Sequence, residues 1–344
     1  MQTIRNYGAH SADRAGTDIP HHACVWQAVF NRPVTGRDRD FSATPMLAFR
    51  KYASLLGAAV LIPLAITFAG ATECRAAEPP EPRRIVSINL AADELVLQLA
   101  EAGNIAALSH LASDPRLSRL ADRAAAFPST STAVEEILML EPDIVFGSQY
   151  TPRITAELLE RLGIEFVALP VATNIDECRE LVLSVAEILG VQKRGEALVA
   201  DMDRRFAELQ QRVAERSIRP TALSYLQGGY TQGAESLLHH IMEAAGLRNH
   251  AESLGIRGEA SLPLEKLILS PPDFLILLPF HDDDPTLGNM LVRHRALRQL
   301  SGRMYRIEIP LAWTINGNNL TVDTAEYLFE QTDAILRERE GEEQ

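Results

Sequence analysis

Two kinds of apolar pattern alternate along residues 83–190. Short apolar runs, of which 85–88 is the first, are typical of strands that are buried on both faces of a parallel sheet. The runs predict strands at 83–88, 105–109, 143–147 and 164–169, and the segments after them predict helices at 94–101, 133–140, 153–162 and 174–189. Strict alternation of strands and helices indicates an α/β lobe whose parallel sheet is covered on both faces.

The same alternation returns after residue 220. It predicts strands at 221–226, 273–278 and 303–309, and helices at 233–245, 263–269, 291–300 and 321–337. We therefore expect a second α/β lobe.

A long amphipathic segment, Val191 to Arg216, joins these two regions. Its apolar residues recur at intervals of four, four, three and four, which places them on one stripe of a helix: Leu198, Met202, Phe206, Leu209 and Val213. At about 1.5 Å per residue, this helix would be roughly 39 Å long. The expected fold class is α/β, with two lobes of mainly parallel sheets bridged by this one helix.

The first 77 residues follow a different pattern. Residues 1–45 have no sustained apolar period, whereas Arg50 and Lys51 precede an apolar run, 53–69, that is followed by small residues. This order is typical of a cleaved secretory signal peptide, here 46–77, and Met46 stands where such a peptide begins. We therefore expect 1–45 to be a non-native extension; N-terminal sequencing of the unprocessed product would overturn this interpretation by finding residues before Met46.

The chain that remains after cleavage of the signal peptide is expected to have three parts. They are an N-terminal lobe at 78–190, the interlobe helix at 191–217 and a C-terminal lobe at 218–344. Cys74 follows the apolar run, but Glu73 precedes it where a lipid-modified cysteine normally follows a small residue. The expected location is therefore the periplasm, without a lipid anchor.

Charge and cysteine content exclude some classes of protein. Residues 1–77 hold 8 of the 33 Lys/Arg and 5 of the 46 Asp/Glu, so the rest has 25 and 41, a formal net charge of −16. Such an acidic protein is a poor candidate for binding nucleic acid or anionic membranes. Cys178 alone remains after export, which leaves no intramolecular disulfide. Its helical spacing with Val182, Val185 and Leu189 predicts a core residue.

Motifs of common enzymes and phosphate-binding loops are missing. The sequence has no G-x-G-x-x-G after a strand, no Gly-x4-Gly-Lys-Ser/Thr loop and no G-x-S-x-G. A periplasmic α/β enzyme remains an alternative, because serines lie at several predicted strand ends. A second alternative is direct zinc or manganese binding by His110 and His281, the latter beside the acidic residues 282–284. An acidic loop with an incidental histidine explains the same residues, so we assign no metal ligand.

Aromatic residues next to predicted strand ends suggest a different kind of ligand. Open α/β sheets bind ligands at the carboxyl ends of their strands. Aromatic rings suit a bulky, partly apolar ligand, and arginines nearby could bind an anionic one. The candidate ligand-binding residues are Tyr150, Tyr230, Trp313, Arg257, Asn89 and Arg153. Ordinary surface packing is the alternative reading of each of these residues taken singly.

One short unit occurs in both lobes. Residues 134–145, VEEILMLEPDIV, resemble residues 264–275, LEKLILSPPDFL. Each unit reads as an apolar residue, Glu, a polar residue, a short apolar helix, Pro-Asp and a strand. The two glutamates, Glu135 and Glu265, are matched acidic points on a surface and do not read as a catalytic pair.

Several of these segments resemble a known family. The opening RRIVSINLAADELVLQL is similar to the first strand and helix of the substrate-binding proteins of iron–siderophore and cobalamin ABC importers. VEEILMLEPDIVFGSQYT resembles the family signature L-E-x-I-x-x-L-x-P-D-L-V, and 191–216 matches its interlobe helix in position and length. The resemblance covers nearly all of residues 83–338. It implies a ligand cleft between the lobes, and that Glu135 and Glu265 dock onto arginines of a membrane permease.

The resemblance also implies what the protein does. We expect a monomer, without enzymatic activity or cofactor, that captures a metal chelate and delivers it to an inner-membrane permease dimer. A ferric siderophore is the first expectation, then cobalamin, then heme. Trp313 lies where the cobalamin binder has an aromatic loop, but residues 314–317 depart from that loop, so the chelate stays open. Closure of the lobes should be small, because a continuous helix offers few hinge residues.

Overall fold

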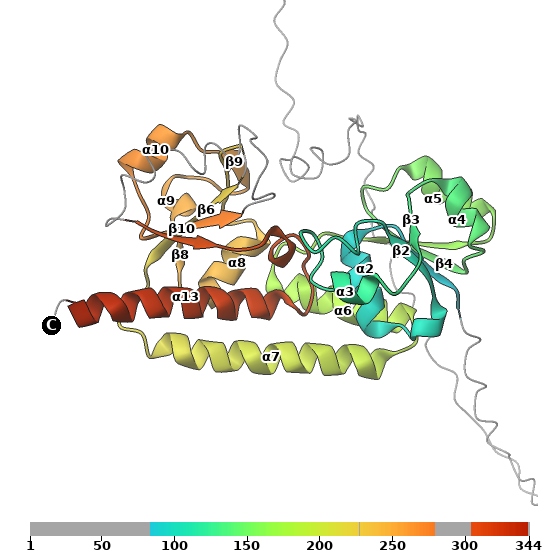
Figure 1. The fold of residues 1–344 in the computed structure, drawn as a ribbon, viewed down its shortest axis with the longest axis horizontal. Helices are drawn as coiled ribbons and strands as arrows, with labels where there is room; N and C mark the ends of the chain where they lie inside the picture. The colour runs from blue at the N-terminus through green and yellow to red at the C-terminus, as the bar shows by residue number, and fades with distance from the viewer. Residues whose placement is uncertain (1–82, 227, 279–303, 343–344) are drawn as a thin grey trace, which may run out of the picture. The chain divides into compact units, whose positions relative to one another are not determined.

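A computed structural model describes residues 83–226, 228–278 and 304–342 (Figure 1). Within these residues the expected fold is confirmed, with two α/β lobes and a long helix between them. The expected extension 1–45, the signal peptide 46–77 and the predicted helix 291–300 lie outside the described residues.

The N-terminal lobe contains a sheet of five strands, all parallel, in the order β3-β2-β1-β4-β5. The strands are β1 (Ile85–Ser87), β2 (Ile105–Ser109), β3 (Ser129–Thr130), β4 (Ile144–Ser148) and β5 (Glu165–Leu169). The helices are α2 (Leu90–Leu99), η2 (Ala102–Asn104), α3 (Ala121–Ala124), α4 (Val134–Met139), α5 (Arg153–Arg161) and α6 (Ile175–Ile188).

Helices cover both faces of this sheet, as the apolar strands predict. Ile85 packs in a core cluster with residues of α2 and α6, whereas the adjacent Val86 packs with Ile137 of α4 and Leu159 of α5. Successive side chains of a strand point to opposite faces, so neighbouring residues join different cores. This explains why the strands read as continuous apolar runs.

The C-terminal lobe contains a mixed sheet in the order β11-β10-β6-β7-β9, with β8 paired to β6. The strands are β6 (Thr221–Leu226), β7 (Tyr230–Gln232), β8 (Arg248–Asn249), β9 (Glu259–Ser261), β10 (Phe274–Leu278) and β11 (Tyr305–Glu308). The helices are α8 (Leu237–Ala244), α9 (His250–Ser253), α10 (Leu264–Leu269), η3 (Leu311–Trp313) and α13 (Thr321–Glu342). Strands β6, β8, β10 and β11 are parallel, and β7 is antiparallel to β6 and β9.

Two predicted helix starts are wrong. The helix predicted at 94–101 begins at Leu90, because the Asn89 side chain accepts hydrogen bonds from the backbone N–H groups of Ala91 and Ala92 and caps it. The helix predicted at 233–245 begins only at Leu237, because strand β7 occupies the preceding residues. Glycines with φ of 81° and 79° at 228 and 229 allow the tight reversal that forms β7.

The interlobe helix is α7 (Gln192–Ala214), and its predicted apolar stripe is the buried one. Met202, Phe206 and Leu209 are buried, and Leu198 and Val213 are partly buried. Helix α7 packs against α6 of the N-terminal lobe and against α8 and α13 of the C-terminal lobe.

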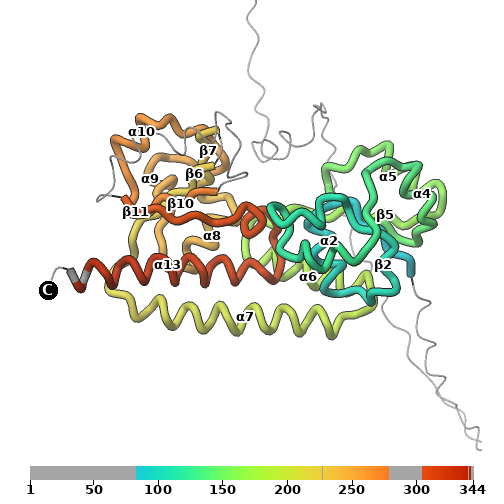
Figure 2. Tube along the Cα trace, in the orientation of Figure 1, coloured from blue at the N-terminus to red at the C-terminus, as the bar shows by residue number. Residues whose placement is uncertain are grey.

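Helix α13 lies beside α7 and runs in the same direction (Figure 2). Arg205 of α7 forms ion pairs with Asp323 and Glu326. Farther along, Arg212 pairs with Glu330 and Arg216 with Asp333, so residue numbers rise together in the two helices. A second helix that the sequence did not associate with the bridge therefore supports it.

Close packing of α7 on α6 depends on Gly195. The sequence suggests only that this glycine weakens the helix. In the structure it is buried, and a Cβ placed on it would overlap the Cβ of Ala186 and lie 3.5 Å from the carbonyl oxygen of Val182. Glycine is therefore required for the two helices to approach this closely.

A buried carboxylate fixes α2 to β2. Asp93 is 0% exposed, and its side chain accepts hydrogen bonds from the Ser109 backbone N–H, at 3.0 Å, and from the Ser109 hydroxyl. Burial raises the pKa of Asp93 from 3.8 to about 7, and the hydrogen bonds from Ser109 and Ser87 oppose that rise only in part. This group therefore changes protonation near neutral pH.

Replacing Gly195 by alanine should destabilise the protein. The overlap with Ala186 is expected to cost about 1–3 kcal/mol, which exceeds the gain of at most about 1 kcal/mol in helix propensity. Urea unfolding of residues 78–344, followed by circular dichroism, measures the change. The double variant Gly195→Ala with Ala186→Gly is the control and should recover most of the lost stability. A Gly195→Ala protein as stable as the wild type would contradict this packing.

Replacing Asp93 by asparagine should flatten the pH dependence of stability. Between pH 3.8 and about 7 the folded protein holds a proton on Asp93 that the unfolded chain has lost. This contribution to the free energy of unfolding is therefore full at low pH and falls as pH rises toward 7, by at most about 1.4 kcal/mol per pH unit. From pH 5 to pH 8 the wild type should lose roughly 2–3 kcal/mol relative to Asp93→Asn.

Urea unfolding at several pH values measures this difference. The exposed residue Asp122 provides the control, since Asp122→Asn should leave the pH dependence of the wild type unchanged. Parallel pH profiles for the wild type and Asp93→Asn would show that Asp93 does not titrate as its burial requires.

Candidate functional site

The repeated unit has the same construction in both lobes. In the first, a side-chain oxygen of Asp143 accepts a hydrogen bond from the backbone N–H of Arg84, at 2.6 Å, just before β1. In the second, Asp273 accepts one from the backbone N–H of Thr221, at 2.7 Å, at the start of β6. Strand β1 neighbours β4, and β6 neighbours β10. The aspartate of each unit therefore fixes its strand to the first strand of its lobe.

Glu135 and Glu265 lie in the first turns of α4 and α10, and both are exposed. Among the described residues, neither carboxylate has a hydrogen-bond or ion-pair partner. The adjacent Glu136 differs, because its carboxylate accepts hydrogen bonds from the backbone N–H and the hydroxyl of Ser131. Glu135 and Glu265 are thus available to a partner.

No side chain caps α4, although several hydroxyl-bearing residues, 129–132, precede it. The residue at the N-cap of α4 is Ala133, which makes no side-chain cap. Ser131 lies two residues earlier, and its hydroxyl accepts a hydrogen bond from the Ala133 backbone N–H at 3.2 Å. The serine therefore orders the turn before the helix and does not cap the helix itself.

Three of the candidate ligand-binding residues lie in the N-terminal lobe. Asn89 caps α2 directly after β1. Tyr150 follows β4 and is 47% exposed. Arg153 opens α5 and pairs with Glu157, four residues later. The Arg153 side chain is 90% exposed, so this pair leaves its guanidinium accessible. His110 of the alternative metal site directly follows β2.

The other three candidates lie in the C-terminal lobe. Tyr230 opens β7 opposite Leu226, the last residue of β6, and is 38% exposed. Arg257 is paired with Glu235 at 2.6 Å. Trp313 follows β11, and His281 of the alternative metal site lies outside the described residues.

Trp313 has contacts to both lobes. The guanidinium carbon of Arg119, from the N-terminal lobe, lies 4.3 Å from the centre of the Trp313 ring. The Tyr327 ring of α13 packs against it edge-on at 5.3 Å. Such cation–π and aromatic contacts hold the indole in place.

Four of the six candidates lie at similar positions in the two sheets. Asn89, Tyr150, Tyr230 and Trp313 come at or beyond the carboxyl ends of β1, β4, β6 and β11, where open α/β sheets bind ligands. Among the described residues, no hydrogen bond, ion pair or ring contact joins two of the six. Their assignment as ligand-binding residues stays a prediction.

A buried junction between the lobes escaped the sequence reasoning. The carboxylate of Glu94 on α2 accepts hydrogen bonds from the Arg119 backbone N–H at 2.9 Å and from the Asn318 side-chain amide at 2.7 Å. Arg119 also donates to the Leu320 carbonyl at 2.7 Å and pairs with Asp323. Burial raises the pKa of Glu94, and these hydrogen bonds oppose that rise. Three asparagines among residues 316–319 were the available signal.

Gly317 and Cys178 lie at the same junction. A Cβ on Gly317 would lie 2.7 Å from the Cβ of Ala172, 3.2 Å from the Cys178 sulfur and 3.2 Å from Leu237. Cys178 is fully buried, which confirms the prediction of a core residue. Burial raises the pKa of its thiol to about 12, so the thiolate needed for reactivity does not form near neutral pH.

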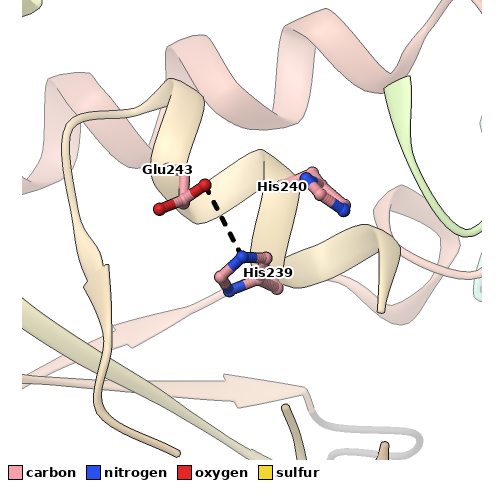
Figure 3. A group of neighbouring side chains, drawn as sticks. All are labelled: His239, His240 and Glu243. Carbon is pink, nitrogen blue, oxygen red and sulfur yellow. Dashed lines mark ion pairs between the residues drawn. The ribbon is translucent and has the colours of Figure 1, made fainter. Parts of the chain in front are cut away.

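Three side chains of α8 could hold a divalent metal ion (Figure 3). Ligand atoms of His239, His240 and Glu243 lie within 4.8 Å of one another, and imidazole with carboxylate is a donor set that zinc accepts. His239 and Glu243 face each other, with 3.5 Å between Nε2 and the carboxylate oxygen. A contact between residues four apart on a helix forms without a metal, so this group alone does not indicate a metal site.

None of the helices in the described part of the chain has the length and apolar character needed to span a membrane.

Comparison with known proteins gives the family. The family described as periplasmic binding protein matches residues 85–301, more than half of the chain. A cobalamin-binding protein of Halobacterium salinarum is 27% identical over 199 residues, which are 57% of this chain and 54% of the relative. The chain thus spans about half the length of the curated relatives it matches.

Solved structures share the fold. A periplasmic heme-binding protein from Roseiflexus sp. RS-1 superposes with a TM-score of 0.59 at 22% identity, covering 73% of this chain and 97% of that one. A protein of an ABC-type Fe3+-hydroxamate transport system from Saccharomonospora viridis gives 0.56 at 23% identity, covering 72% and 92%. With two lobes, the long helix between them and a match over more than half of its residues, the chain belongs to the periplasmic binding protein family.

Proposed function

We propose that the chain is the solute-binding component of an ABC importer. It captures a metal chelate in the periplasm and delivers it to an inner-membrane permease dimer, without covalent chemistry. The observation that carries this proposal is the repeated unit: on each lobe of a periplasmic binding protein it presents one exposed glutamate that has no partner among the described residues. Two matched anionic points suit a partner with two matched cationic points.

The proposed ligand site is the region between the lobes at the carboxyl ends of the strands. Tyr150 and Tyr230 are partly exposed aromatic residues and would contact a flat or bulky chelate. Trp313 would contribute an indole that Arg119 and Tyr327 hold in place. Arg257 and Arg153 would attract an anionic chelate, with Asn89 at the end of β1.

Closure around the ligand should be small. Helix α7 has no interruption between Gln192 and Ala214, and α13 lies along it. The buried hydrogen bonds of Glu94 and Arg119 to the segment before α13 connect the lobes a second time. Hinge motion needs residues that absorb a large change of φ and ψ, and these connections restrict it.

The chelate is proposed as a class, with a ferric siderophore first. Cobalamin has specific support, because the curated relative at 27% identity is named a cobalamin-binding protein. Heme and ferric hydroxamate are supported by the names of proteins that share the fold. Direct zinc or manganese binding through His110 and His281 is the alternative within transport.

Ligand binding can be followed by the fluorescence of Trp313, since the other tryptophan, Trp26, lies in the segment expected to be removed. Ferric hydroxamates, ferric catecholates, cyanocobalamin, heme, zinc and manganese would be titrated into residues 78–344, with calorimetry to exclude optical artefacts. One chelate should bind, and Tyr150→Ala and Tyr230→Ala should each weaken it by about tenfold. Failure of every compound, together with hydrolysis of an ester or a glycoside, would contradict the transport function.

Reversing both matched charges should abolish transport. The double variant Glu135→Arg with Glu265→Arg replaces the attraction to permease arginines by repulsion, while ligand affinity stays that of the wild type. Cellular uptake of the chelate identified by titration is the measurement. Glu180→Arg with Glu196→Arg changes the net charge equally at two exposed positions and should leave uptake intact. Normal uptake with the first pair would contradict docking through these glutamates.

A further inference from the structure

The repeated unit carries a second matched and exposed position. Leu269 is 85% exposed and Met139 is 78% exposed, the highest values of any large apolar side chain in the described part of the chain. In the aligned units they occupy the same place, each four residues after its glutamate. Among the described residues, the two most exposed large apolar side chains thus belong to the unit that occurs in both lobes.

Helix geometry places each apolar residue beside its glutamate. Residues four apart lie on the same face of a helix, so Met139 adjoins Glu135 and Leu269 adjoins Glu265. On the opposite face, Ile137 and Leu267 are fully buried and hold the helices on their lobes. Each lobe therefore presents one carboxylate and one apolar side chain together, on a firmly packed helix.

The two units differ at several other positions. Residues 136, 140 and 141 are Glu, Leu and Glu, whereas the equivalent residues 266, 270 and 271 are Lys, Ser and Pro. A single exposed leucine or methionine is ordinary on a protein surface. The same exposure at equivalent places of both units, although neighbouring residues differ in charge and polarity, favours a shared role.

We propose that Met139 and Leu269 are the apolar anchors with which the two lobes dock onto a permease dimer. Each would enter an apolar pocket beside the cation that pairs with the neighbouring glutamate. A dimer is the partner that fits, because its two halves offer two equal sites, and α4 and α10 are carried by different lobes, both away from α7 (Figure 1). Buried apolar anchors supply affinity, whereas exposed charge pairs set register and rate of encounter. This inference rests on the proposed function.

Photo-crosslinking identifies the partner in cells. The photoreactive amino acid p-benzoylphenylalanine would replace Met139, Leu269 or, as a control, Ile218, which is 50% exposed and lies outside both units. Crosslinks from 139 and 269, but not from 218, to the same ABC permease polypeptide are expected. Crosslinks to another copy of this chain, to a different membrane component, or to nothing would overturn the proposal.

Polar substitutions measure how much Met139 and Leu269 contribute to the affinity of docking. Binding of residues 78–344 to that permease complex in nanodiscs would be compared for Met139→Ser, Leu269→Ser and the double variant. Each single change should weaken docking by about tenfold and the double change by about a hundredfold, since each removes the burial of one apolar side chain. Ile218→Ser should change it by less than about twofold, and thermal unfolding would verify that every variant is folded. Wild-type affinity of the double variant would overturn the proposal.

These experiments distinguish failure of this inference from failure of the proposed function on which it rests. If the proposed function is wrong, none of the titrated chelates binds to residues 78–344. If only the role of the anchors is wrong, the chelate binds and charge reversal abolishes uptake, but Met139→Ser with Leu269→Ser transports normally.

Discussion

The close contact between α6 and α7 is the constraint on which the two-lobe arrangement depends. Gly195 lets the interlobe helix approach α6 at Ala186, and the stripe that includes Met202 and Phe206 continues the buried surface along α7. Helix α13 runs parallel to α7 and forms ion pairs with it, the first of them from Arg205 to Asp323 and Glu326. A bridge packed along its length transmits the position of one lobe to the other, which a flexible linker would not do.

A second connection between the lobes is made by buried hydrogen bonds. Glu94 and Arg119 of the N-terminal lobe bind the segment that leads into α13. Burying a carboxylate costs free energy unless it is hydrogen-bonded. Separating the lobes at this junction would leave Glu94 without the hydrogen bond from Asn318 and is therefore unfavourable. The lobes therefore have a preferred relative position. This position would hold Glu135 and Glu265 at a fixed distance from each other, to which a partner could be complementary.

The repeated unit shows how local sequence and function are combined. Its aspartates, Asp143 and Asp273, serve the fold, since each fixes its strand to the first strand of the lobe. Its glutamates do not serve the fold, because they have no partner among the described residues. Of the two acidic positions that both units share, the aspartate is bound within the fold and the glutamate is exposed, so only the glutamate is a candidate for docking.

The sequence by itself determined the strand–helix alternation, the long amphipathic helix, the buried Cys178 and the repeated unit, because each depends on periodicity within a few turns or strands. It did not determine that Asn89 caps α2, although a cap residue is a local signal. The apolar residues 85–88 lie directly before Asn89, so the sequence pattern assigns residues 89–93 to the turn after the strand and not to the helix. Only the tertiary structure decided the role of Gly195, the partners of Glu94 and the exposure of Met139 and Leu269. Each of these depends on whether residues far along the chain come to lie against the side chain, and no local pattern records that.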